Sequence, residues 1–190
     1  MTATELYDIL NYVDHSREKR LEMAHMVSNN PRMIEPLLCI ALQTDDPISS
    51  KACWVLEFTA KQDLSCLFPF MDLFMDSLPA VRLESSIRPF AKICEYLAIS
   101  YFKDKNPRTQ KNLSESHLEK MATACFDWLI GDYKVAAKAY SMTSLVLLGS
   151  KFDWINPELK MVLEQNYALG SAAYKARARM ILSKLRKKGL

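Results

Sequence analysis

The sequence predicts an all-α fold, an α-α superhelix (solenoid) of about five antiparallel helix pairs in one domain of 190 residues. Three observations predict it. Apolar residues recur at helical spacing along most of the chain, and no strand-like alternation interrupts them. The four glycines stand where helices are expected to end or in the C-terminal tail. Four similar segments recur, each at a predicted helix start, as in stacked helical repeats.

The most regular helix is predicted over residues 132–149, DYKVAAKAYSMTSLVLLG. We expect Asp132 to cap its first turn and Gly149 to close it in the left-handed conformation. An apolar stripe covers most of the circumference, so neighbouring helices must cover it on more than one side. The stripe contains Val135, Ala139, Met142 and Val146, and the polar edge contains Lys134, Lys138, Ser141 and Ser144.

Residues 1–30 are predicted to form two N-terminal capping helices. Thr2 and Glu5 have capping-box spacing for the first, which ends near residue 13. Asn30-Pro31 and Asp46-Pro47 open the next two helices, which reach about residues 44 and 61. Pro69 starts or kinks a helix in the bulky segment 64–78, and the long run 79–102 is bent near Pro89.

Residues 31–187 are predicted to hold the repeats, with one exposed loop at 103–112. Ser116 and Glu119 form a capping-box pair for a helix that ends at Gly131. In the short connection after residue 149, we expect Trp154 to fill a gap between layers. The last two helices start at Asn156-Pro157 and at Ser171.

The composition is that of a globular protein, with 49% hydrophobic and 25% charged residues, which excludes wholesale disorder. The net charge of +3 is unevenly distributed, because residues 171–190 carry seven Lys or Arg and no acid. Five cysteines without CxxC spacing are expected to be reduced core residues of a cytoplasmic protein. No secretory signal and no apolar run of about 20 residues is visible, so no membrane association is predicted.

The four recurring segments begin at Pro47, Pro79, Tyr133 and Ser171, at intervals of 32, 54 and 38 residues. Each places a small residue four positions after its first apolar or small one, as Ile48 and Ala52 illustrate. This pattern resembles HEAT or armadillo repeats over residues 31–187. The resemblance implies an extended surface for binding partners. An irregular helical bundle is the alternative.

The chain also resembles a small bacterial family whose members commonly carry the name adenylosuccinate lyase. The segments are CWVLEF at Cys53, CFDWLIGD at Cys125, KVAAKAYSM at Lys134 and GSAAYKARAR at Gly170. The resemblance implies a lyase whose loop, roughly GSSAMPYKRNP, would place its catalytic serine at Ser171. Here the Pro and Asn of that loop are absent, and the alanines favour a continuous helix. The motifs therefore assign no catalytic residue.

The histidines and tryptophans are the remaining candidates for metal binding or base stacking. Three scattered histidines, His15, His25 and His117, lack metal-ligand spacing, so we expect no metal and no cofactor. Three tryptophans, Trp54, Trp128 and Trp154, suggest the base-stacking groove of helical-repeat DNA glycosylases. They occupy apolar positions, however, which favours a role in the core.

The sequence predicts a non-catalytic protein–protein interaction or scaffold module. Its candidate binding surface is a set of basic residues on the second helices of the repeats, suited to a protein or acidic peptide partner. The alternatives are a lyase, as the family resemblance implies, and nucleic-acid binding through the basic inner and C-terminal helices. The sequence assigns no oligomeric state. The basic set comprises Arg82, Arg88, Lys134, Lys138, Lys175, Arg177 and Arg179.

Overall fold

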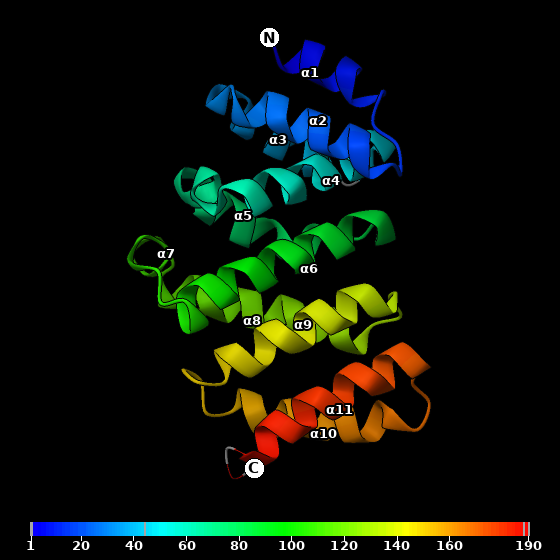
Figure 1. Cartoon of the computed structure of the whole chain (residues 1–190), viewed down its shortest axis with the longest axis vertical. Helices are drawn as coiled ribbons and strands as arrows, with labels where there is room; N and C mark the ends of the chain where they lie inside the picture. The colour runs from blue at the N-terminus through cyan, green and yellow to red at the C-terminus, as the bar shows by residue number, and fades with distance from the viewer. Residues whose placement is uncertain (1, 44, 188, 190) are drawn as a thin grey trace. The chain divides into compact units, whose positions relative to one another are not determined.

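A computed structural model describes residues 2–43, 45–187 and 189 (Figure 1). Within these residues the secondary structure is entirely helical, which confirms the predicted all-α class. No helix in this part of the chain is both long and apolar enough to span a bilayer. The chain divides into two compact units, one ending at Ile93 and the other beginning at Cys94. Helix α6 (Glu84–Ala98) crosses this boundary, and the single domain stays a prediction.

The first unit holds the N-terminal helices and the first part of α6. Helices α2 and α3 both pack against α4, and α1 packs against α3 and α4. Short 3-10 helices at Pro31–Met33, Leu64–Phe70 and Leu78–Ala80 connect the longer elements. The α-helices are α1 (Ala3–Leu10), α2 (Arg17–Ser28), α3 (Ile34–Ala41), α4 (Pro47–Gln62) and α5 (Met71–Ser77).

The second unit begins within α6, which continues into a π-helical turn at Ile99–Lys103. Helix α8 packs against α9, α10 packs against α11, and α9 also packs against α11. The second helices of two consecutive pairs are therefore in contact (Figure 1). The remaining helices are α7 (Pro107–Asn112), α8 (Glu115–Ile130), α9 (Val135–Leu148), α10 (Ile155–Tyr167) and α11 (Ala172–Lys187).

Several helix starts follow the local signals. Thr2 and Glu5 form the predicted capping box of α1. Asp46 caps α4, whose first residue is Pro47, because its carboxylate accepts the backbone N–H of Ile48 over 2.8 Å. The third predicted helix was expected to reach residue 44, which lies outside the described residues; α3 ends at residue 41.

Pro89 lies inside α6 and has no N–H to donate to the Ser85 carbonyl one turn earlier. The Trp54 indole on α4 supplies a donor instead: Nε1 donates to the Ser85 carbonyl oxygen over 2.9 Å. Ser50 on the same helix is hydrogen-bonded to the hydroxyls of Ser85 and Ser86. The first two repeated segments therefore contact each other directly within the first unit.

The segment 103–112 is not the continuous loop that was expected. Its second half forms α7 (Pro107–Asn112), because Asn106 accepts the backbone N–H groups of Arg108 and Thr109 and Pro107 suits a first helical turn. The segment is exposed as predicted, apart from Thr109, which is buried and hydrogen-bonded to Ser100. The capping box of α8 lies at Ser114 and His117, two residues before the predicted pair.

The helix predicted at 132–149 is α9, and its ends and inner face differ from expectation. It begins at Val135 without a side-chain cap, so Asp132 does not cap it. Gly149 has a φ of −66°, outside the left-handed region, but a Cβ there would collide with the Asn156 side chain. The Asn156 amide donates to the Gly149 carbonyl over 2.7 Å, so close approach explains this glycine. Two predicted polar-edge residues are fully buried, Ser141 and Ser144.

Candidate functional site

The structure separates the seven basic residues of the predicted surface. Arg82 and Arg88 belong to the first unit, and Arg82 precedes α6 in an exposed position. The other five belong to the second unit, two at the start of α9 and three on α11. The set on the second unit is the candidate that the structure brings together, because α9 and α11 pack side by side.

Arg88 is engaged in an ion pair with a buried carboxylate. Its Nη2 donates to Glu57 Oε2 over 2.7 Å and its Nη1 to Oε1 over 3.4 Å. The Glu57 side chain is only 8% exposed. Burial raises the pKa of Glu57, while the nearby charges of Arg88, Lys92 and Arg20 oppose that rise. Arg88 therefore neutralises the buried Glu57 carboxylate with both terminal nitrogens of its guanidinium.

Arg20 reaches the same region from α2. Its guanidinium lies over the Trp54 ring, 4.5 Å from the ring centroid. The centroids of the His15 and Trp54 rings are 4.9 Å apart. Burial lowers the pKa of Arg20, and the like charge of Arg88 adds to this effect. These side chains cover Trp54, which is 8% exposed, so it offers no open stacking face.

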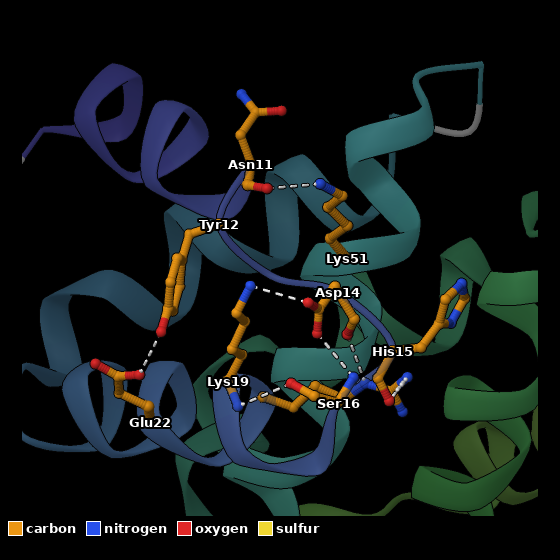
Figure 2. A network of polar contacts seen from close by, with 9 residues as sticks. Asn11, Tyr12, Asp14, His15, Ser16, Lys19, Glu22 and Lys51 are labelled. Atoms are coloured by element: carbon orange, nitrogen blue, oxygen red, sulfur yellow. Dashed lines mark hydrogen bonds and ion pairs between the residues drawn. The ribbon is translucent and has the colours of Figure 1, made fainter.

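A polar network holds the link between α1 and α2 in place (Figure 2). Arg20 donates to the carbonyls of Asp14 and His15, and Lys19 forms an ion pair with Asp14 over 2.9 Å. Hydrogen bonds from Lys19, Ser16 and the Ser16 backbone lower the pKa of Asp14 far below its ordinary value. Lys51 on α4 donates to the Asn11 carbonyl, which ties the link to α4 (Figure 2). This network positions Arg20 over Trp54.

Arg177, on α11, joins three helices of the second unit. Its Nη2 donates to Thr143 Oγ1 over 2.7 Å and to Glu95 Oε1 over 3.2 Å, and its Nε donates to the Ala139 carbonyl over 3.3 Å. The side chain of Glu95 is 5% exposed and that of Arg177 is 29% exposed. Arg177 thus connects α6, α9 and α11, and about 29% of its side chain stays exposed.

The other cations of this unit remain nearer the surface. Lys134 is exposed at the N-cap position of α9, and Lys175 is half-buried on α11. Arg179 is exposed and donates to the Tyr167 hydroxyl over 3.1 Å. Lys138 is half-buried and lines a cavity of about 480 Å³. This volume lies in the range of known ligand pockets.

The cavity is built where α8 and α10 end and where α9 and α11 begin. Ser171 stands before α11, and its Oγ accepts the backbone N–H of Tyr174 over 3.2 Å. A Cβ on Gly170 would collide with the Tyr174 ring, so only glycine lets this ring lie against the connection. The lining residues are Leu129, Tyr133, Val135, Lys138, Asn166, Leu169, Gly170, Ser171 and Tyr174.

The electrostatics of the cavity favour an anion. Lys138 supplies a positive charge, and the N-terminal ends of α9 and α11 add the partial positive charge of helix starts. Tyr174 is 5% exposed, and its hydroxyl has no hydrogen-bond partner among the described residues. Burial raises the pKa of Tyr174 above its ordinary value.

Sequence reasoning singled out Lys138 and Ser171 but missed the rest of the cavity. Tyr133 lies in the connection before α9, Asn166 on α10 and Tyr174 on α11, and they share no motif. In the sequence, the Gly170-Ser171 pair indicates only the tight connection between α10 and α11. The lining residues come close together only when the two helix pairs pack against each other.

The predicted core roles of the aromatic and thiol groups need two corrections. Trp128 is buried, but Trp154 is 54% exposed and stacks on Phe126 at 5.6 Å between ring centroids. It therefore covers a neighbouring ring on the surface and does not fill a gap between layers. The five cysteines are free thiols, and three of them are buried, whereas Cys39 is exposed and Cys66 is intermediate.

Among the described residues, no group of three or more His, Cys, Asp or Glu is placed to hold a metal ion. Comparison with known proteins found no match to a family model, to a curated protein or to a solved structure.

Proposed function

We propose that this protein is a non-catalytic interaction module that binds an acidic segment of a protein partner through the second helices α9 and α11. The observation that carries the proposal is the position of Lys138, which lines a cavity shared with the first residues of α11. Lys175 lies next to the lining residue Tyr174 on α11. Positive charge on two adjacent helices suits a negatively charged partner.

The proposal includes a HEAT-like superhelix of about five antiparallel pairs in a single cytoplasmic domain. Contacts between α3 and α4, α8 and α9, and α10 and α11 support the pairing. The contact between α9 and α11 supports stacking of equivalent helices. Repeats stacked in this way form surfaces rather than enclosed reaction sites.

Affinity capture from bacterial cytosol tests the proposal with the full chain as bait. The variant Lys138→Glu/Lys175→Glu reverses two charges that have no role in the ion pairs described above. We expect it to recover the partner at least about tenfold less well, equivalent to roughly 1.4 kcal/mol of binding free energy. Lys111→Glu, an exposed change on α7, is the matched control and should bind as the wild type. Equal recovery by all three proteins would refute the proposal.

Arg177 must stay unchanged in this test. Its reversal to Glu would place a negative charge beside Glu95 and disturb three helices, so lost binding would report lost packing. From the sequence, Arg177 could not be distinguished from the other six residues of the predicted basic surface.

Nucleic-acid binding is the second candidate, because α11 carries six Lys or Arg and no acidic residue. Retention on duplex or single-stranded DNA that falls steeply with salt would support it. The lyase hypothesis is tested by release of fumarate from adenylosuccinate, lost on Ser171→Ala. The hydroxyl of Ser171 accepts the Tyr174 N–H, which supports a role as a helix cap.

A further inference from the structure

The cavity at the start of α9 and α11 holds donors suited to a carboxylate. The Lys138 ammonium has three N–H groups, and a charge-assisted bond to a carboxylate is among the stronger hydrogen bonds. The Ser171 oxygen already accepts the Tyr174 N–H, which leaves its O–H to donate. The Asn166 amide donates one hydrogen to the Val162 carbonyl over 2.9 Å and has a second one.

The walls of the cavity combine polar and apolar surface in nearly equal shares. Leu129, Val135 and the rings of Tyr133 and Tyr174 line it together with the polar groups. The cavity is open to solvent on one side, so an anion that enters would keep part of its contact with water while it meets the Lys138 ammonium. The Tyr174 ring contributes to the wall, whereas its hydroxyl oxygen is buried behind that wall and is not exposed in the cavity. Lys138, Ser171 and Asn166 therefore favour a short acidic group, and Leu129 and Val135 supply apolar surface for its aliphatic stem.

Leu169 indicates that the occupant extends beyond the cavity. This residue lines the cavity, yet 92% of its surface is exposed to water. Burying a leucine side chain is favourable by about 1.5–3 kcal/mol, which a partner surface would gain by covering it. A small free acid within the cavity would leave most of Leu169 in water. An extended protein segment can fill the cavity and cover Leu169 together.

We infer, resting on the proposed function, that this cavity accepts the carboxylate side chain of a Glu or Asp in a partner segment, next to an apolar side chain that covers Leu169. Lys138 binds the carboxylate, and Ser171 and Asn166 orient it. Leu169 selects the neighbouring apolar residue. The cavity thereby gives the basic surface a sequence preference that charge alone does not supply.

Backbone amide NMR of the full chain tests the inference with two probes, acetyl-Glu-Leu-amide and acetyl-Gln-Leu-amide. We expect the Glu peptide to shift amides within 129–138 and 166–175 and to bind at least about fivefold more tightly than the Gln peptide. Lys138→Gln should abolish this preference, and Lys111→Gln should keep it. Ser171→Gly removes the hydroxyl while Gly remains acceptable at an N-cap, so a reduced preference in a folded protein is expected.

Each other outcome overturns the inference. Equal binding of both peptides would show that the carboxylate is not recognised. Shifts elsewhere, or no shifts, would show that the cavity is not the site. Shifts at the cavity with inorganic phosphate or a DNA oligonucleotide, but not with the Glu peptide, would assign it to phosphate. If these results coincide with charge-dependent capture of a protein partner, only the role of the cavity fails and the proposed function stands.

Discussion

The hydrogen bond between Trp54 and Ser85 predicts a measurable coupling between Trp54 and Pro89. Pro89 leaves the Ser85 carbonyl without its helical donor, and the indole Nε1 replaces that donor at 2.9 Å. Trp54→Phe removes the indole donor and keeps an aromatic ring. Pro89→Ala restores a backbone N–H at the position that normally bonds Ser85. The cost of losing the indole should therefore depend on which residue occupies position 89.

The magnitude follows from the exposure of the carbonyl. An unsatisfied buried acceptor costs about 1–3 kcal/mol. Ser85 is exposed whereas Trp54 is nearly buried, so water can partly replace the lost donor. We therefore expect Trp54→Phe to cost about 1 kcal/mol more in the wild-type background than in the Pro89→Ala background. Loss of ring area and of the stacked Arg20 occurs in both backgrounds and cancels in the difference.

Urea denaturation of the wild type, both single variants and the double variant measures this coupling as free energies of unfolding. Each protein should unfold in one cooperative transition with an unchanged slope. Equal costs of Trp54→Phe in the two backgrounds, within about 0.3 kcal/mol, would refute the reasoning. The indole would then not compensate for the proline.

Three further predictions concern stability. Arg177→Met should lower the free energy of unfolding by about 3 kcal/mol, because it removes the cation that pairs with buried Glu95. Arg179→Met, a change at an exposed position, should alter it by no more than about 0.5 kcal/mol. Equal thermal midpoints of the two variants would contradict this prediction. Ala137→Leu should overpack a site that is 2% exposed and lower the free energy of unfolding by about 1–3 kcal/mol. Ala139→Leu, at a half-buried site, should lower it by less when both variants are unfolded with urea. Burial raises the pKa of Glu57 in the folded protein, so the folded state binds its proton more tightly than the unfolded chain does. The stability that this proton binding contributes is present at low pH and is lost as pH rises through the raised pKa. Urea midpoints should therefore fall with rising pH relative to Glu57→Gln, and parallel pH profiles would contradict this.

The sequence by itself determined the helical class and those helix starts that depend on neighbouring residues. The capping box of Thr2 and Glu5 and the Asp46-Pro47 start act within a few positions of one chain segment, so they could be predicted directly. Alanine-rich residues after Ser171 favoured a helix over a mobile loop, and α11 begins there as expected. The start of α9 was misplaced because Asp132 is the one cap-type residue nearby, whereas the helix begins three residues later, after Lys134, which makes no side-chain cap.

The tertiary structure alone decided which charges are available for binding. Arg88 and Glu57 are 31 residues apart in the chain, and Arg177 and Glu95 are 82 apart. No local periodicity reports such pairs, because a cation on a helix face looks the same whether a buried carboxylate or water lies opposite. The cavity at Lys138 likewise exists only where the ends of two helix pairs meet. Helix propensity is a local property, whereas neutralising buried charge requires groups that only folding brings together.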